Sequence, residues 1–334
     1  MSAKLPSQLK RFADRALLSQ IEENLELVEV ELLEATKHTD PVLQNAARHL
    51  VEAGGKRVRP VLVLLTSLLG DGATQRVIDA AAIVELTHLA TLYHDDVMDD
   101  APTRRGVPTA QNVFSNSIAI LIGDLLLARA SILSTQLGIE AITMQAHTFE
   151  RLCIGQLNET VGARESEDAI DHYIQVLADK TGSLIAASAK LGVMMGNADP
   201  KYLEPLSEFG EKIGVAFQLI DDVIDISEAG PSGKTPGTDL RAGVPTMPVL
   251  LLRKRADSDP TAAALLAEID GDLSSDERLA EVVAKLRNHP VADEAFEAAK
   301  RWADEAIEAL DALPDGQTKR ALIHFAQAVV NRDN

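Results

Sequence analysis

Apolar residues recur three or four positions apart along almost the whole chain, the pattern typical of amphipathic helices. No convincing run of alternating β-branched residues, as a strand would require, interrupts this pattern. The pattern predicts helices at about 7–37, 40–53, 58–69, 74–100, 115–135, 138–163, 167–191, 200–228 and 246–257, followed by several amphipathic helices up to 333. We therefore expect an all-α protein.

Glycine and proline mark the breaks between these helices, at 54–55, 70–72, 103–108 and 230–245, and none of the breaks is a long flexible linker. The segment 74–100 is apolar nearly all round, as a central helix should be. The part after 258 is richer in Glu, Asp and Lys, which is typical of an outer layer. We expect a single domain over residues 1–334, in which the helices surround a central pocket.

The net charge and the composition exclude some classes of binding partner. With 32 Lys and Arg against 51 Asp and Glu, the formal net charge is −19, which opposes non-specific binding to nucleic acid or to an anionic membrane. Aromatic residues make up only 3% of the chain, so few rings are present on which bases could stack. We therefore expect no nucleic-acid partner.

The cysteine content and the apolar runs bear on the compartment. Cys153 is the only cysteine, which excludes a disulfide framework within the chain and fits a reducing environment. The N-terminal segment lacks an apolar signal core, and no run reaches about 18 uninterrupted apolar residues, since Asp124 interrupts the longest candidate. We expect a cytoplasmic protein without an integral membrane segment, although a lipid-like ligand stays possible.

Two apolar helices end in the same acidic pattern, DDxxD. The six carboxylates are Asp95, Asp96 and Asp99 in HDDVMDD, and Asp221, Asp222 and Asp225 in LIDDVID. Carboxylates at a helix C-terminus face the negative end of the helix dipole and repel one another, so a positive partner is expected there. Positions i and i+4 share one helix face, and oxygen-only ligands suit Mg²⁺. A single copy is usually a solvated helix end, but two copies favour a pair of metal sites.

Basic residues gather at four breaks or helix ends: GGKRVRP at 54–60, PTRRG at 102–106, DKTG at 179–182 and GKTPG at 233–237. Arg presents a planar fork of donors and Lys a point charge, the two usual ways of holding phosphate. Each cluster alone could be a solubilising surface loop. Together with the paired aspartates, they indicate a pocket for two diphosphates, one held through metal and one held directly.

These blocks, in this order, resemble the polyprenyl synthetase family of trans-isoprenyl diphosphate synthases. The resemblance covers nearly the whole length and includes ELTHLATLYHDDVMDDAPTRRG, GDLLLARA, DKTGSLIAAS, FQLIDDVIDI and GKTPGTDLRAGVPTMPVL. It implies an all-α bundle around a deep central cavity, a homodimer, and three Mg²⁺ ions per active site bound by the six aspartates of the two motifs. One departure is Val244, which stands where many family members carry Lys.

The resemblance also implies roles for the basic and polar residues. Isopentenyl diphosphate is expected to be bound by Lys56, Arg59, His88 and Arg105. The allylic diphosphate is expected to be contacted by Arg104, Lys180, Thr181, Gln218 and Lys234, of which Lys180, Thr181 and Gln218 are also expected to act in catalysis. His88 alone could be an ordinary core histidine, but it precedes Asp95 by two helical turns on the same face.

The implied reaction is ionisation of an allylic diphosphate followed by attack of the alkene of isopentenyl diphosphate. In the family, side chains below the first motif block the cavity and set product length. Here the nearest positions on the same helix face are small, Ala90, Thr91 and Thr87, so we expect a long product, heptaprenyl to nonaprenyl. Segments 121–128 and 142–149 either line the deeper tunnel or are ordinary core.

Four other interpretations are weighed against this one. A farnesyl or geranylgeranyl diphosphate synthase would make a shorter product with the same chemistry. A class I terpene cyclase would replace the second DDxxD, and an inactive partner subunit would lose aspartates, but both motifs are complete here. A non-catalytic acidic scaffold that binds cations could carry the same aspartates, but it would not consume isopentenyl diphosphate.

Overall fold

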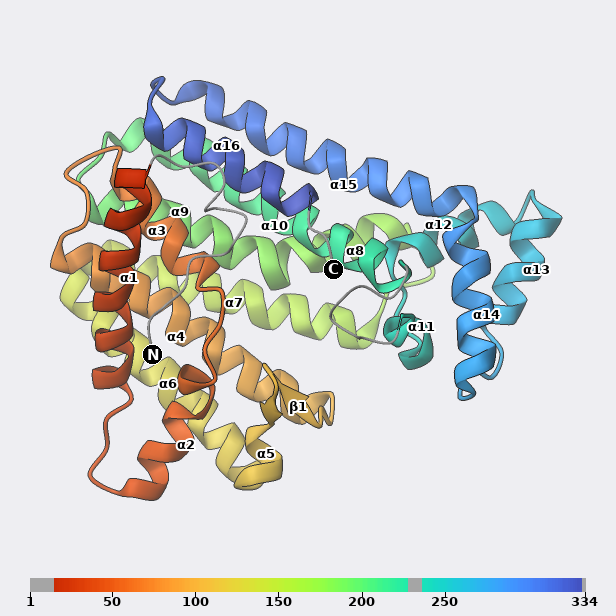
Figure 1. Ribbon diagram of the computed structural model, residues 1–334, viewed down its shortest axis with the longest axis horizontal. Coiled ribbons are helices and arrows are strands. Elements are labelled where there is room, and N and C mark those ends of the chain that lie inside the picture. Colours follow the sequence, from red (N-terminus) through yellow and green to blue (C-terminus); the bar gives the residue numbers. More distant parts are fainter. Residues whose placement is uncertain (1–14, 228–235, 332–334) are drawn as a thin grey trace. The chain divides into compact units, whose positions relative to one another are not determined.

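The computed structural model describes residues 15–227 and 236–331, and these residues are almost entirely helical (Figure 1). The longer helices are α1 (Arg15–Ala35), α2 (Pro41–Glu52), α3 (Val58–Ser67), α4 (Gln75–Met98), α6 (Asn116–Leu137), α7 (Ile139–Val161), α8 (Ala169–Leu177), α9 (Ser183–Met195), α10 (Leu203–Asp225), α12 (Met247–Ala256), α13 (Pro260–Ile269), α14 (Asp276–Arg287), α15 (Pro290–Ala309) and α16 (Gln317–Val330). The short ones are α5 (Ala110–Val113), η2 (Ala178–Gly182), η3 (Pro200–Tyr202), α11 (Thr238–Ala242) and η4 (Leu310–Ala312). The expected all-α fold is confirmed.

Most expected helices are present within a few residues of their predicted ends. Three details differ from the prediction. The expected break at 103–108 contains a hairpin of two short strands, β1 (Thr103–Arg104) and β2 (Val107–Pro108). The expected break at 230–245 contains α11. The expected helix 167–191 includes a π-helical turn, η2, between α8 and α9. Such short elements depend on local turn geometry rather than on a hydrophobic period. Residues 7–14, 228 and 332–333, which the predicted helices included, lie outside the described residues.

The described helices form two compact units along the chain. The first takes in the described parts of Met1–Arg151, Ser183–Gly210 and Ala309–Phe325, and the second takes in those of Leu152–Gly182, Glu211–Glu308 and Ala326–Asn334. Each unit is described by itself below. One domain over residues 1–334 stays a prediction.

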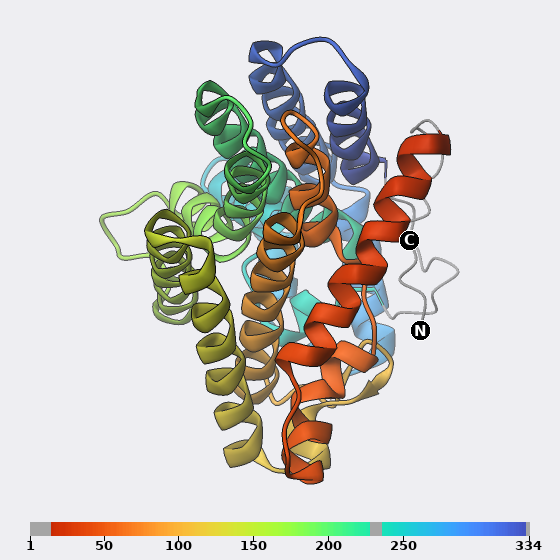
Figure 2. The ribbon, with the colours of Figure 1, turned by 90° about the vertical axis from the view of Figure 1, so that its left-hand side faces the viewer.

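In the first unit, α4 lies between α1 and α6 (Figure 2) and also contacts α3 and α9. Its side chains are buried on every side, including Ile83, Leu86, Leu89 and Tyr93. The Tyr93 hydroxyl donates a 2.6 Å hydrogen bond to the carbonyl of Ala46 in α2. The prediction of a central helix at 74–100 is therefore confirmed within this unit, and α4 carries the first acidic motif at its C-terminal end.

In the second unit, a core around Val215, Leu219 and Ile220 of α10 includes Leu177 of α8 and Met247 of α12. A separate core joins α12, α13 and α14 through residues such as Leu252, Leu265 and Val282. The C-terminal end of α10 carries the second acidic motif, so each unit contains one DDxxD at the end of a long apolar helix.

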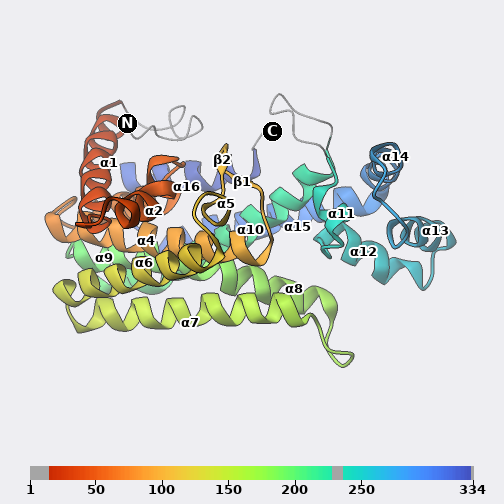
Figure 3. The ribbon, with the colours of Figure 1, turned by 90° about the horizontal axis from the view of Figure 1, so that it is seen from below.

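The hairpin β1–β2 and the short helix α5 follow α4 and lie next to each other in Figure 3. Among the described helices, only α6 is long and apolar enough to span a membrane by length and composition. That test also selects core helices of other proteins, and α6 packs along α4. The length and composition of α6 are therefore weak evidence for a membrane span.

Candidate active site

The first acidic motif places its three carboxylates in different surroundings. Asp95 is partly exposed in the last turn of α4, Asp96 is fully buried, and Asp99 is the exposed C-cap residue. The Asp99 amide donates a 2.8 Å hydrogen bond to the carbonyl of Asp95 and closes the helix. Asp95 and Asp99 are therefore the two residues of the motif that solvent can reach.

Asp96 forms an ion pair with Arg104, which follows in the hairpin. The Arg104 Nε and Nη2 atoms lie 2.7 and 2.6 Å from the same carboxylate oxygen, Oδ1. The other oxygen, Oδ2, is buried and has no hydrogen-bond partner among the described residues. Burial raises the pKa of Asp96 above its usual value, while Arg104 opposes that rise.

Gln111 holds the loop that presents Arg104, and sequence reasoning missed this residue. Its side-chain amide donates to the carbonyls of Asp96, at 2.7 Å, and Ala101, at 3.0 Å. The hydroxyl of Thr109 also donates to Ala101, at 2.7 Å. These bonds attach the hairpin to the end of α4 and so fix the backbone positions of Arg104 and Arg105.

The residues expected to bind isopentenyl diphosphate are all in the first unit. Arg59 and Arg105 are partly exposed, and the Nε of Arg59 is buried without a hydrogen-bond partner among the described residues. Burial lowers the pKa of Arg59 to about 10, with nearby Arg105 acting in the same direction. Lys56 is exposed in the loop before α3.

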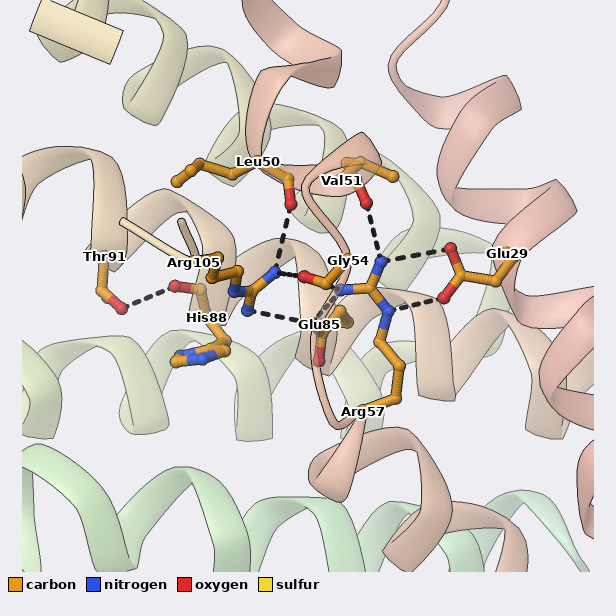
Figure 4. Close-up of polar contacts among 9 residues, drawn as sticks. All are labelled: Glu29, Leu50, Val51, Gly54, Arg57, Glu85, His88, Thr91 and Arg105. Carbon is orange, nitrogen blue, oxygen red and sulfur yellow. Dashed lines mark hydrogen bonds and ion pairs between the residues drawn. The ribbon is translucent and has the colours of Figure 1, made fainter. Parts of the chain in front are cut away.

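His88 lies in α4 close to Arg59 and Arg105, which together form the arginine cluster of the first unit, and Figure 4 draws His88 beside Arg105. Burial lowers the pKa of its imidazole well below the usual value, and Arg59 and Arg105 lower it further. The ring is therefore neutral at pH 7, and its N–H remains available as a neutral donor.

The buried carboxylate of Glu85, the partly exposed carboxylate of Glu29 and the buried guanidinium of Arg57 complete the cluster, and sequence reasoning did not identify them. Arg57 binds Glu29 of α1 and Glu85 of α4, with Nε–Oε1 and Nη1–Oε1 distances of 2.5 and 2.8 Å. A signal was present, because Glu85 is an ionisable residue inside the apolar run AAAIVELTHLA, and such residues are seldom buried without a partner.

The second acidic motif also contains one buried member. Asp222 accepts hydrogen bonds at Oδ2 from the Tyr173 hydroxyl, at 2.7 Å, and from the amide of Met247, at 2.9 Å. Burial raises the pKa of Asp222 to about 7 despite these two donors. Burial also raises the pKa of Tyr173, and the Asp222 charge adds to that rise. Asp221 is partly exposed.

Asp225 binds the start of α11. Its Oδ1 accepts from the hydroxyl and amide of Thr238, at 2.7 and 3.2 Å, and its Oδ2 accepts from the amide of Asp239, at 3.1 Å. Both carboxylate oxygens of Asp225 therefore already have protein donors.

Of the residues expected at the allylic diphosphate, three lie in the second unit. Lys180 and Thr181 are in the π-helical turn η2, and Gln218 is partly exposed in α10. Lys180 forms an ion pair with Glu159 of α7. A π-helical turn often marks a functional site, because it turns side chains away from the regular helical positions. Lys234 lies outside the described residues.

Val244, the departure from the family pattern, is 40% exposed, and its amide donates a 2.9 Å hydrogen bond to the carbonyl of Asp239. The backbone around this position is thus attached to α11. The valine side chain contributes no hydrogen-bond donor where many family members have a lysine ammonium group.

The positions expected to govern product length lie along α4. Ala90 and Thr87 are buried and Thr91 is partly exposed, so a prenyl chain passing Ala90 requires neighbouring side chains to move. A separate pocket of about 560 Å³ in the first unit is lined by α7, α9 and the start of α10. Met144 and Thr148, from the segment 142–149, contribute to its wall.

The donor set fits a hard divalent cation. Among the described residues no three acidic, His or Cys side chains converge into a ready-made metal cage. Mg²⁺ does not require one, because it usually binds one or two carboxylates, keeps several waters and takes substrate phosphates as further ligands. The exposed carboxylate of Asp99 and the orphaned oxygen of Asp96 are oxygen donors of this kind.

Comparison with known proteins identifies the family. Residues 40–286 match the polyprenyl synthetase family. The chain is 42% identical to nonaprenyl diphosphate synthase of Mycobacterium tuberculosis over 96% of this chain and 93% of that protein. It is 34% identical to heptaprenyl diphosphate synthase component 2 of Geobacillus stearothermophilus, over 96% and 99% of the two chains.

A solved structure supports the same assignment. Geranylgeranyl pyrophosphate synthase from Corynebacterium glutamicum, solved with calcium and isoprenyl diphosphate, matches with a TM-score of 0.86 and 41% identity over 96% of this chain and 98% of that one. The predictions of the family and of a trans-prenyltransferase are thereby confirmed: the chain belongs to the polyprenyl synthetase family.

Proposed function

We propose that this enzyme catalyses the Mg²⁺-dependent head-to-tail condensation of isopentenyl diphosphate with an allylic diphosphate, such as farnesyl or geranylgeranyl diphosphate, and releases a long all-trans polyprenyl diphosphate. The observation that carries the proposal is the arginine cluster of the first unit, in which the buried Nε of Arg59 has no partner among the described residues. A buried unpaired donor costs free energy, so an anionic ligand is expected there.

The proposed reaction begins with heterolysis of the allylic C–O bond. Mg²⁺, three ions in the proposal, held by Asp95, Asp96 and Asp99 and by Asp221, Asp222 and Asp225, would supply positive charge against the leaving diphosphate. Arg104, Lys180 and Lys234 would donate to that diphosphate, and Thr181 and Gln218 would present oxygen atoms to the carbocation. The isopentenyl alkene then forms the new C–C bond, and the released diphosphate takes the proton.

The second substrate would be bound through Lys56, Arg59, His88 and Arg105. Burial lowers the pKa values of His88, Arg59 and Arg105, and the neighbouring positive groups lower them further. The negative charge of an entering diphosphate would oppose both effects. Binding of isopentenyl diphosphate should therefore favour the charged form of each of these three residues.

A product of heptaprenyl to nonaprenyl length is supported by small side chains at Ala90 and Thr91 and by relatives named nonaprenyl and heptaprenyl diphosphate synthase. The structural neighbour from Corynebacterium glutamicum is named for the shorter geranylgeranyl product, which is the product expected under the short-chain alternative.

We also propose a cytoplasmic homodimer. The exposed apolar residues Ile120, Leu121 and Ile132 of α6, with exposed fractions of 43%, 65% and 54%, provide a surface for a second copy. Sedimentation analysis tests this arrangement: a Leu121→Glu variant should shift the protein to the monomer. A monomeric wild type would contradict it.

The decisive experiment is incubation of the purified chain with isopentenyl diphosphate, each allylic starter and Mg²⁺, followed by chromatographic sizing of the product. We expect a heptaprenyl to nonaprenyl product that disappears when EDTA is added. A farnesyl or geranylgeranyl product would favour the short-chain alternative. No consumption of isopentenyl diphosphate would favour the non-catalytic scaffold.

A further inference from the structure

Arg57 lies in the middle of the GGKRVRP block but has no donor left for a ligand. Its guanidinium donates to both oxygens of Glu29, at 2.5 and 3.1 Å, to Glu85 at 2.8 Å, and to the carbonyls of Val51 and Gly54, at 3.0 and 3.5 Å. An arginine has five N–H donors, and these five contacts use them all. Arg57 is therefore a structural cation, unlike its neighbour Arg59.

Glu85 is the carboxylate that Arg57 shares with the proposed binding site. Its side chain is only 2% exposed, and its Oε1 lies 2.8 Å from Arg57 Nη1 and 3.8 Å from Arg105 Nη2 (Figure 4). The Glu85 charge also opposes the fall in the pKa of Arg59 and of Arg105. One buried negative charge thus faces three guanidinium groups.

The two glycines before Lys56 also contact the Arg105 guanidinium. Arg105 Nη1 donates to the carbonyl of Gly54 and, at 3.1 Å, to that of Leu50. A Cβ atom on Gly55 would lie only 2.9 Å from the Arg105 Cζ, whereas a Cβ atom on Gly54 would meet nothing within 4 Å. The guanidinium of Arg105 is therefore packed directly against the bare backbone of Gly55.

We propose that Arg57 and Glu85 are positioning residues for the isopentenyl diphosphate site. They do not touch the substrate; they hold the loop 53–57 and the guanidinium of Arg105 where the diphosphate binds. The inference rests on the proposed function, because it takes isopentenyl diphosphate as the ligand of Arg59 and Arg105.

Glu85→Gln distinguishes positioning from charge, since the two roles predict opposite signs. If Glu85 acted only through its charge, its removal would leave the site more positive and would strengthen diphosphate binding. If Glu85 positions the arginines, its removal weakens binding, because a neutral amide holds Arg57 and Arg105 less strongly than a carboxylate does.

The experiment measures kcat and the Michaelis constant for each substrate in Glu85→Gln, Arg57→Lys and wild type. We expect the Michaelis constant for isopentenyl diphosphate to rise about tenfold or more, with kcat and the allylic constant changed less than about threefold. Lysine keeps the positive charge of Arg57 but lacks the fork that binds two carboxylates at once. Arg57→Lys should therefore not retain the wild-type Michaelis constant for isopentenyl diphosphate.

A matched glycine pair tests the same geometry without altering any charge. Both Gly54 and Gly55 have positive φ, so alanine strains the backbone at either position, but only Gly55→Ala presses on Arg105. We expect Gly55→Ala to raise the isopentenyl diphosphate constant and Gly54→Ala to raise it much less. Equal effects of the two alanines would overturn the proposed packing.

Folding and surface charge are controlled separately. Should Glu85→Gln fail to fold, Glu29→Gln at the partly exposed edge of the network replaces it, and we expect a smaller shift in the same direction. Glu34→Gln on the same helix α1, at a carboxylate with 65% side-chain exposure, controls for the change in net charge and should leave both constants unchanged. Thermal denaturation of every variant reports its folding.

Calorimetric titration with isopentenyl diphosphate separates failure of this inference from failure of the proposed function. A wild type that binds isopentenyl diphosphate but forms no product refutes only the reaction, and weaker binding by Glu85→Gln then still supports positioning. Unchanged or tighter binding by Glu85→Gln, or a parallel rise of both Michaelis constants, overturns the inference. A wild type that does not bind isopentenyl diphosphate overturns both.

Discussion

Arg104 holds Asp96 through one carboxylate oxygen. Both the Nε and the Nη2 of Arg104 lie within hydrogen-bond distance of Oδ1, at 2.7 and 2.6 Å, and Oδ2 is buried without a hydrogen-bond partner among the described residues. A carboxylate with one oxygen paired and one unpaired is prepared for a further positive ligand. The buried member of the first motif is thus compensated only in part by the protein.

Removal of Arg104 should therefore make stability fall more strongly as pH rises. In Arg104→Ala, Asp96 loses the cation that opposes the rise of its pKa, so burial raises that pKa further. A carboxylate with a raised folded-state pKa destabilises the fold as pH increases. We expect a loss of about 1–3 kcal/mol at pH 8 and a smaller loss at pH 5, measured by urea denaturation without metal. A loss that does not change with pH would contradict this account.

Loss of one of the partly exposed carboxylates proposed to bind metal should abolish condensation and leave the fold intact. In Asp95→Ala or Asp221→Ala, removal of one negative charge also relieves repulsion within each motif, so stability without metal should change little or increase. Product formation with Mg²⁺ and thermal denaturation without it measure the two effects. Turnover like that of the wild type in either variant would falsify the metal assignment.

Asp222 should destabilise the metal-free protein above neutral pH. Its folded-state pKa is raised to about 7, whereas an unfolded aspartate titrates near 3.8, so the unfolded chain releases this proton first. Stability is therefore lost as pH rises between these values, by an amount on the order of a few kcal/mol. Asp222→Asn should be more stable than wild type at pH 8 and similar at pH 4.5. The reverse order at pH 8, in urea denaturation without metal, would disprove it.

The two diphosphate sites should respond separately to loss of a cation. Arg105→Ala should raise the Michaelis constant for isopentenyl diphosphate more than that for the allylic substrate, because a charge-assisted contact contributes about 1.5–3 kcal/mol. By the family resemblance, Lys234→Ala should show the opposite bias. Steady-state kinetics with each substrate varied in turn measures both constants, and equal effects on the two would mean that the sites are assigned wrongly.

Ala90→Phe should shorten the product. Ala90 is fully buried in α4, so a ring at this position overpacks the helix and should cost about 1–3 kcal/mol of stability. The ring would also block a prenyl chain growing past the first motif, and products should stop at geranylgeranyl size or below while isopentenyl diphosphate is still consumed. Thr87→Ser, a smaller change one turn earlier, serves as the control. An unchanged long product would place the length determinant elsewhere.

The helices and both acidic motifs followed from the sequence, because each depends on residues within one element. An apolar period of three to four residues marks a helix wherever it packs, and Asp95 and Asp99 share a face because they are four residues apart. The blocks shared with the family suggested which basic residues accompany the aspartates, and the match over residues 40–286 confirms the family itself. Local information was sufficient for the fold class and for the chemistry of the donor groups.

Tertiary structure decided which of these charged groups are paired within the protein and which keep a buried polar atom without a partner among the described residues. Both Glu29 and Glu85 are 28 residues from Arg57 in the sequence, so their pairing depends on how α1 and α4 pack around the loop. The same holds for Asp222, which Tyr173 approaches from 49 residues away. Burial and pairing are properties of packed helices, and periodicity within one helix carries no record of which neighbour will cover a given carboxylate.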